Sequence, residues 1–242
     1  MPAGRRVQKI VGWDRGIEWA AVHAAPAETV LPVPRRLGTD LVLLVADMCT
    51  LAADFAACYR PVMTTWIAFL RGINVGGNNK LPMKDLLALL TPAGFPDVKS
   101  YIQSGNLIFR SATSTAPQLA KRISAAVLAK RGFQPHVLVL NVRELARAVA
   151  SNPFPDAEAD PRSLHLYFLA ESPTRPDVAA LNRIKSKAES FAIDGKVFYL
   201  HAPEGIGRSK LAAQAEKLIG VEATARNWRT VSKVLEMASQ LG

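Results

Sequence analysis

The stretch Met63-Thr-Thr-Trp-Ile-Ala-Phe-Leu70 marks the point at which the chain takes on the pattern of a folded domain. Its run Trp66–Leu70 is apolar and has the length of a buried strand. A loop rich in glycine and asparagine follows, Arg71-Gly-Ile-Asn-Val-Gly-Gly-Asn-Asn-Lys80. After it, Pro82 suits the first turn of a helix, and apolar residues then recur at helical spacing. The order strand, glycine loop, helix therefore opens an α/β domain at Met63.

The same alternation continues through the first part of the domain. Strands are predicted at Lys99–Gln103 and Leu107–Arg110, on either side of a Ser-Gly turn. A helix follows the capping pair Thr115 and Gln118, and the wholly apolar Val137–Leu140 predicts a central strand. With a further helix after Asn141, the order is β-α-β-β-α-β plus a helix, which is the ferredoxin-like pattern.

The second part of the domain repeats much of this order. Leu164–Phe168 predicts a strand, and a helix is expected near Pro176–Ala188. Asp194-Gly195 is a strong hairpin signal between two short strands. A helix from Ser209 and a last helix from about Asn227 complete a β-α-β-β-α-α order, with no strand predicted between these two helices.

These patterns predict an α+β fold made of two ferredoxin-like (βαββα-type) subdomains side by side, with extra helices. We expect the first subdomain to span residues 63–152 and the second 153–242, joined through the proline-rich and acidic segment 152–162. Residues 1–62 are expected to be a poorly structured N-terminal extension, disordered or produced by a misassigned start.

The composition narrows the classes of function. The chain carries a formal charge of +10, and from Met63 onward 23 Lys and Arg against 14 Asp and Glu give +9, so the domain itself attracts anions. Both cysteines, Cys49 and Cys58, precede Met63, which excludes a thiolate nucleophile, a disulfide and a cysteine-ligated zinc from the domain. The run Leu41–Cys58 is too short and too acidic for a membrane span. We expect a cytoplasmic protein with no cofactor, no metal and no membrane contact; the sequence gives no indication of the oligomeric state.

Four blocks of residues carry a family resemblance. They are Arg71-Gly-Ile-Asn-Val-Gly-Gly-Asn-Asn-Lys80, Tyr101-Ile-Gln-Ser-Gly-Asn106, Tyr199-Leu-His-Ala-Pro-Glu-Gly-Ile-Gly-Arg-Ser-Lys210 and Arg226-Asn-Trp228. In this order they resemble the bacterial domain of unknown function 1697, over about Met63 to Leu241. The resemblance implies an uncharacterised bacterial α/β protein with a ferredoxin-like part. It supplies no catalytic residues, and it does not extend to residues 1–62.

The first candidate site is the loop that follows the opening strand. Its glycines let several N–H groups approach one ligand, and the next helix N-terminus adds partial positive charge. The candidate ligand-binding residues are Arg71, Asn74, Gly76, Gly77, Asn78 and Lys80. Asn78 and Asn79 stand where a P-loop needs Lys and Ser or Thr, which excludes a P-loop NTPase. A plain strand-to-helix turn that needs glycine remains the alternative.

Two further loops are candidates. Gln103, Ser104 and Asn106 form either a tight turn or a polar edge that could hydrogen-bond a base or sugar. The loop Gly205-Ile-Gly-Arg-Ser-Lys210 precedes a helix start at Ser209, which favours either anion binding or a simple capped turn. The candidate residues here are Gly205, Gly207, Arg208, Ser209 and Lys210, and Arg226 and Trp228 are added as a cation beside an aromatic ring. For Trp228 the alternative is core packing.

His201 is the only candidate for catalysis, as a proton carrier at the end of a strand. The favoured function is binding of an anionic ligand, such as a nucleotide or a phosphorylated or carboxylated small molecule. The alternatives are an enzyme that acts on a phosphorylated small molecule, a nucleic-acid-binding module and a protein-interaction module. Nucleic-acid binding is less favoured, because the predicted strands lack the paired stacking aromatics of RNA-recognition modules. A protein-interaction module predicts that Lys80, Asn106 and Arg208 lie far apart, whereas a common site predicts convergence.

Overall fold

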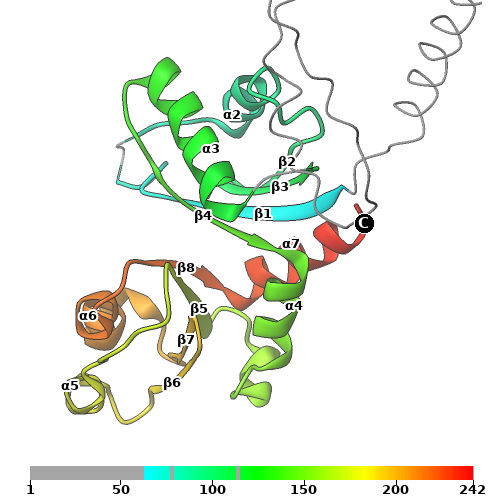
Figure 1. Cartoon of the computed structure of the whole chain (residues 1–242). Helices are drawn as coiled ribbons and strands as arrows, with labels where there is room; N and C mark the ends of the chain where they lie inside the picture. Colours follow the sequence, from blue (N-terminus) through cyan, green and yellow to red (C-terminus); the bar gives the residue numbers. More distant parts are fainter. Residues whose placement is uncertain (1–62, 77–78, 113–114, 242) are drawn as a thin grey trace, which may run out of the picture. The chain divides into compact units, whose positions relative to one another are not determined.

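The computed structural model describes residues 63–76, 79–112 and 115–241. The expectations for residues 1–62 lie outside these ranges. The described residues build two four-stranded antiparallel sheets covered by α-helices (Figure 1). No helix in this part of the chain combines the length and the apolar character needed to cross a bilayer.

The first sheet contains β1 (Thr64–Arg71), β2 (Lys99–Tyr101), β3 (Asn106–Ser111) and β4 (His136–Asn141), in the order β2-β3-β1-β4. All three pairings are antiparallel. The central strand β1 is buried on both faces over Ile67–Leu70, as its uninterrupted apolar run predicts. The edge strand β4 is less buried, although its sequence is equally apolar.

Helices α2 (Met83–Leu90) and α3 (Ala116–Arg131) cover the outer face of the first sheet. Pro82 stands immediately before α2, where its missing N–H removes no helical hydrogen bond. At the start of α3, the backbone N–H of Thr115 donates to Oε1 of Gln118 at 3.0 Å. The predicted capping pair is therefore present, and Gly132 ends the helix in a left-handed conformation (φ 74°).

The second sheet contains β5 (Leu164–Leu169), β6 (Ser190–Asp194), β7 (Val197–His201) and β8 (Ala223–Asn227), in the order β6-β7-β5-β8. The sequence-based order for this part was wrong in one respect, because β8 was not predicted. Its sequence, Ala-Thr-Ala-Arg-Asn, is short and contains no large apolar residue, and it is a strand because it pairs along the edge of β5.

Helices α5 (Val178–Ile184) and α6 (Lys210–Ile219) cover the outer face of the second sheet. Helix α5 is shorter than the predicted Pro176–Ala188, because the chain turns extended at Lys185. Two short 3-10 helices, η2 (Pro155–Ala159) and η3 (Ile206–Arg208), complete the connections. Segment 152–162 is thus partly ordered, and Ala157 within η2 is buried.

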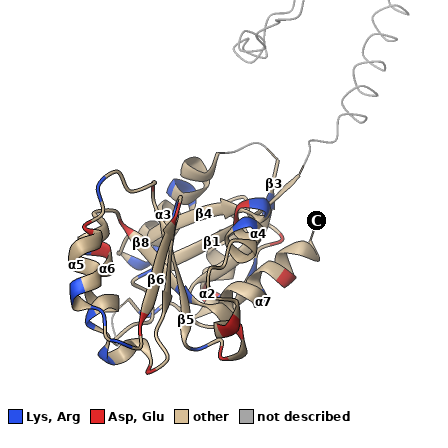
Figure 2. Ribbon diagram, turned by 90° about the horizontal axis from the view of Figure 1, so that it is seen from below, with Lys and Arg blue, Asp and Glu red and all other residues tan. Residues whose placement is uncertain are grey.

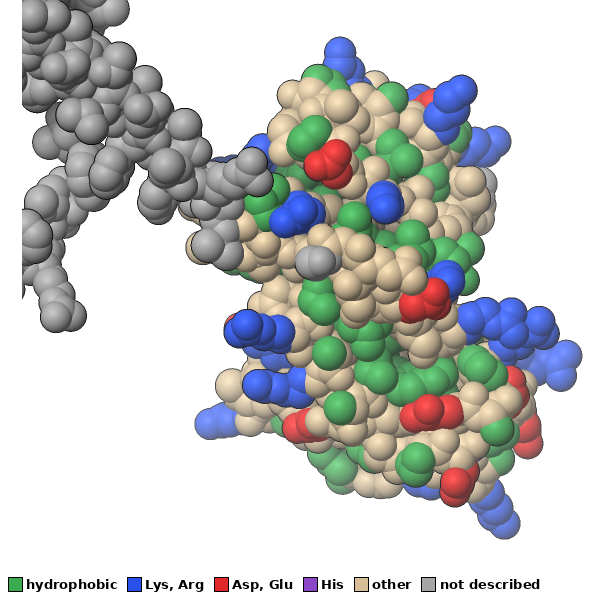
Figure 3. Space-filling view, turned by 90° about the vertical axis from the view of Figure 1, so that its right-hand side faces the viewer, with side chains coloured by type: hydrophobic (Ala, Val, Ile, Leu, Met, Phe, Trp, Pro, Cys, Tyr) green, Lys and Arg blue, Asp and Glu red, His purple; other side chains and the backbone are tan. Residues whose placement is uncertain are grey.

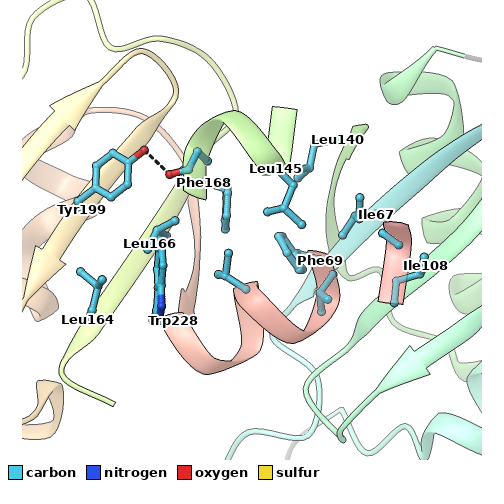
Figure 4. Packing of buried hydrophobic residues seen from close by; sticks show 14 of the residues in the cluster. Ile67, Phe69, Ile108, Leu140, Leu145, Leu164, Leu166, Phe168, Tyr199 and Trp228 are labelled. Atoms are coloured by element: carbon cyan, nitrogen blue, oxygen red, sulfur yellow. Dashed lines mark hydrogen bonds between the residues drawn. The ribbon is translucent and has the colours of Figure 1, made fainter. Parts of the chain in front are cut away.

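The inner faces of the two sheets share one core with helices α4 (Val142–Ala150) and α7 (Trp228–Ser239) (Figures 1 and 4). Phe69 of β1 and Phe168 of β5 bring the sheets into contact, with ring centroids 5.1 Å apart. The hydroxyl of Tyr199 donates to the carbonyl oxygen of Ala148 at 2.8 Å, so β7 is tied to α4. Trp228 belongs to this core and is 6% exposed. We call the part from β1 to α4 the first half and the part from η2 to α7 the second half.

Candidate functional site

Two of the three predicted loops converge on one cavity between the halves. Its volume is about 420 Å³. The walls come from the end of β1 and the loop after it, from the β2–β3 turn, from β8 and from one side of α6. The cavity lining includes Arg71, Asn74, Ser104, Glu216 and Arg226. The cavity therefore contains residues far apart in the sequence, which the strand order brings together.

Asn74 holds the first loop to the second. It adopts a left-handed backbone (φ 54°), and its Nδ2 donates to the carbonyl oxygens of Leu81 and Gln103, both at 2.8 Å. Its Oδ1 accepts from the N–H of Leu81 at 2.7 Å. Gln103 Oε1 in turn accepts from the N–H of Met83 at 3.3 Å. The polar side chains of Asn74 and Gln103, predicted to contact a ligand, are thus used to position the cavity wall.

Arg226 projects from β8 across to the first half. Its guanidinium donates to Asn106 Oδ1 at 2.5 Å and to the carbonyl oxygens of Leu70 at 2.8 Å and Ser104 at 2.9 Å. A fourth bond reaches the carbonyl oxygen of Ala225 at 2.8 Å. All four acceptors are neutral. Since a guanidinium has one N–H more than these bonds use, one N–H of Nη1 has no acceptor in the described part of the chain.

Arg226 is partly buried, and no described carboxylate neutralises its positive charge. It forms no salt bridge among the residues that the structure describes. Burial lowers its pKa to about 10. The face of the Phe69 ring lies 5.0 Å from its Cζ, which gives partial compensation. Arg226 therefore keeps a positive potential at the base of the cavity.

Arg71 stands at the more exposed side of the cavity, where its Nη1 contacts Glu216 Oε1 of α6 at 2.6 Å. The side chains are 43% and 36% exposed, so the pair is worth about 1 kcal/mol or less to stability. The hydrogen bond to Glu216 raises the pKa of Arg71. This ion pair joins the end of β1 to α6.

Unusual backbone conformations gather in the same two loops. The only non-glycine residues with positive φ in the described ranges are Asn74 (φ 54°), Asn79 (φ 48°) and Ile102 (φ 48°). Asparagine tolerates this region, but a β-branched side chain rarely adopts it. Ile102 is also 49% exposed, so core packing does not explain its conformation. Backbone strain of this kind is concentrated at functional sites in proteins.

The remaining predicted residues lie elsewhere. Gly76 and Lys80 are exposed and do not line the cavity. Gly77 and Asn78 lie outside the described residues. The loop with Gly205, Gly207 and Arg208 and the start of α6 at Ser209 and Lys210 do not line it either. Ser209 Oγ accepts from the N–H of Ala212 at 2.9 Å, so it serves as a helix cap.

His201 and Trp228 also lie away from the cavity. The ring of His201 lies beside that of Phe154, with centroids 6.0 Å apart. Trp228 packs in the core, which agrees with the alternative interpretation of this residue and not with a role in stacking on a ligand. Within the described ranges, no group of three or more His, Cys, Asp or Glu side chains is placed to hold a metal.

Sequence reasoning missed Glu216, Tyr167 and the small residues of α6 that line the cavity. Ala212 and Glu216 are half-buried beside the buried residues Leu211 and Ala215 of α6, and Ala213 is exposed. In a sequence this is the ordinary pattern of an amphipathic helix. These residues of α6 line the cavity only because the strand order places α6 and β8 next to the loops of the first half.

The two antiparallel sheets, the helices that cover them and the cavity built from loops place the chain among mixed α/β proteins with two similar halves. The profile of the protein family of unknown function DUF1697 matches residues 63–199, and the chain belongs to this family. The conserved bacterial protein SP0830 from Streptococcus pneumoniae has a similar structure, with a TM-score of 0.55 and 25% sequence identity. The similarity covers 73% of this chain and 99% of that one. No curated protein matches the chain.

Proposed function

We propose that the protein binds a small anionic ligand in the cavity between the β1–α2 loop, the β2–β3 turn, β8 and α6. The observation that carries this proposal is Arg226, a partly buried cation whose four hydrogen bonds all go to neutral acceptors. A charge in this position is costly unless something compensates it. An anion in the cavity would supply the compensation and would use the remaining N–H of Nη1.

Backbone groups support the same proposal. The N–H groups of Gly72, Ile73 and Ser104, all at the cavity wall, donate to no acceptor in the part of the chain that the structure describes. N–H groups of successive residues with alternating backbone hand form concave sites that favour anions. A volume of about 420 Å³ lies within the range usual for small-molecule sites.

Nucleic-acid binding is the weaker proposal. Lys and Arg residues are distributed over many elements, as the blue segments of the ribbon in Figure 2 show, and they do not form one continuous stripe in that view. Figure 3 shows a second face, on which Lys and Arg side chains project at the edges and hydrophobic side chains gather in the hollow between the upper and lower parts. Extended phosphate backbones are usually followed by a continuous basic surface. The catalytic alternative stays a prediction. The protein-interaction alternative also stays a prediction, and the expected convergence of Lys80, Asn106 and Arg208 on one site is not seen, because none of the three lines the cavity.

Arg71→Gln tests the proposal with little risk to the fold, because Arg71 is exposed and its ion pair contributes little stability. The charged residues of the wall are Arg71, Arg226 and Glu216, a net of +1, and the substitution reduces it to zero. Binding of butyrate and of monoethyl phosphate to the full chain is measured by calorimetric titration. We expect the affinity to fall about tenfold or more in Arg71→Gln.

Arg131→Gln is the matched control. Arg131 also forms a partly exposed ion pair, with Asp85, but it does not line the cavity. The proposal is wrong if neither anion binds the wild-type chain, or if the two substitutions weaken binding equally.

We propose further that each half is ferredoxin-like. The first half supports this with the order β-α-β-β-α-β and the strand arrangement β2-β3-β1-β4, and the second half has the equivalent arrangement β6-β7-β5-β8. A division into subdomains 63–152 and 153–242 and a cytoplasmic location also stay proposals.

A further inference from the structure

We infer that the cavity selects a compact monoanion, a carboxylate or a phosphodiester with an apolar remainder, and that Glu216 is the residue that excludes dianions. The inference rests on the proposed function. It adds the charge and the chemical class of the ligand, and it assigns a specificity-determining role to a residue of α6.

The charge of the cavity wall favours a ligand with one negative charge. Among the described residues that line the cavity, only Arg71, Arg226 and Glu216 are charged, so two positive charges face one negative charge. The Glu216 carboxylate already neutralises Arg71 through the contact at 2.6 Å. The charge that remains for a ligand is that of Arg226. One negative charge on the ligand balances it, whereas a second would face the Glu216 carboxylate without a free cation.

The number of free donors at Arg226 also favours a monoanion. Four hydrogen bonds hold its guanidinium to Asn106 and to three carbonyl oxygens. It therefore cannot present the two-pronged face that arginine usually offers to a phosphate dianion. One free N–H, together with nearby backbone N–H groups, suits an anionic group with a single charge.

The uncharged part of the wall bears on the rest of the ligand. Its apolar residues are Val75, Ala212, Ala213, Ala223 and Ala225, and they lie beside the polar residues Asn74, Gln103, Ser104 and Thr224, of which Asn74 and Gln103 already bond to backbone groups. Val75 is 68% exposed although it is a large apolar residue in a polar loop. A hydrocarbon group beside the anionic group would cover these side chains. A multiply charged remainder would find no free cation there, because Arg71 is already paired with Glu216.

The experiment compares three probes on the full chain at about pH 8. Butyrate and diethyl phosphate carry one negative charge. Monoethyl phosphate carries close to two, because the second pKa of a phosphate monoester is about 6. Calorimetric titration gives a dissociation constant for each probe with the wild type, with Glu216→Gln and with the control Glu236→Gln. Glu236 is also a helical glutamate in an exposed ion pair, with Lys233, but it lies on α7 and does not line the cavity.

We expect the wild type to bind both monoanions roughly tenfold more tightly than monoethyl phosphate. Glu216→Gln raises the net charge of the wall from +1 to +2 and should remove this preference or reverse it, while Glu236→Gln should keep it. A carboxylate ligand and a phosphodiester ligand are told apart by which of the two monoanions binds more tightly.

The outcomes separate this inference from the proposed function. If no probe binds to the wild type, the proposed function fails and the inference fails with it. If the probes bind and Arg71→Gln weakens them, but Glu216→Gln leaves the ratio of monoanion to dianion affinity unchanged, only the inference is overturned.

Discussion

The two halves have the same arrangement of strands but different loops. The strand orders are β2-β3-β1-β4 and β6-β7-β5-β8, so in each half the strand that comes first in the chain, β1 or β5, lies next to the edge strand that comes last, β4 or β8. In the first half, the connection from β1 to α2 contains Gly72, Asn74, Gly76 and Asn79, all with positive φ. The equivalent connection from β5 to α5, residues 170–177, contains no residue with positive φ. The sheets therefore fix where a site can form, and the loops of one half form it.

The β–β turns differ in the same way. Gly105 in the first half has φ 70°, and a Cβ added there would lie 2.7 Å from Leu70 Cβ and 2.7 Å from Ile73 Cδ1. Gly195 in the second half has φ 54°, and nothing lies within 4 Å of an added Cβ. Both turns need a residue in the left-handed conformation, but only the turn at Gly105 packs against residues that line the cavity, Leu70 and Ile73.

The largest expected effect on stability comes from replacing Gly105 by alanine, with the same replacement at Gly195 for comparison. Gly105→Ala combines left-handed strain with a steric overlap against β1, and we expect it to lower the free energy of unfolding by about 3 kcal/mol. Gly195→Ala adds only the strain and should cost about 1 kcal/mol. Urea unfolding of both variants measures the difference. Equal losses would mean that the two turns are packed alike, and the comparison would fail.

A gain of stability is expected at Ile102. Ile102→Gly releases left-handed strain of about 1–3 kcal/mol and loses about 1 kcal/mol through the flexibility of glycine in the unfolded chain. The net expectation is a rise of about 1 kcal/mol in the free energy of unfolding, measured in urea. Val75→Gly is the control, because Val75 is exposed without positive φ and glycine should only destabilise there. A loss of stability in Ile102→Gly would show that its side chain stabilises the loop.

The smallest effect concerns pH and belongs to the second half. His165 of β5 is 8% exposed, and burial lowers its pKa. Below about pH 6.5 the unfolded chain therefore binds a proton that the folded chain resists, so stability is lost as the pH falls. We expect a loss on the order of 1 kcal/mol between about pH 7 and about pH 5, measured by urea unfolding, and a smaller loss in His165→Leu. An identical pH dependence in that variant would assign the effect to other groups.

Local signals in the sequence were sufficient for much of the fold. The pair Asn141 and Glu144 caps α4 with reciprocal hydrogen bonds of 2.8 and 3.0 Å, as its spacing predicts. The Asp194-Gly195 turn joins β6 to β7, as predicted, because two adjacent residues are enough to favour the backbone conformation that this turn requires. Membership in DUF1697 was also predictable, because four blocks of residues carry it.

Features that depend on distant residues were not predictable. Strand β8 exists through its pairing with β5, and Arg226 acts through groups that are more than a hundred residues away, Asn106 and the carbonyl of Leu70. The sequence marked Arg226 as a cation beside an aromatic ring, but the ring expected was that of Trp228. The ring that it contacts is that of Phe69, and Trp228 is buried in the core.

Helix α7 lies between the sheets and supplies Trp228, Val231, Val234 and Ala238 to their shared core. It follows every strand of both sheets in the chain. During synthesis, at about 5–20 residues per second, the inner faces of both sheets therefore lack part of their cover until α7 leaves the ribosome. The nascent chain has to stay soluble over that interval with these apolar faces incomplete. A stop codon before α7 would leave a product that is a substrate for chaperones and proteases.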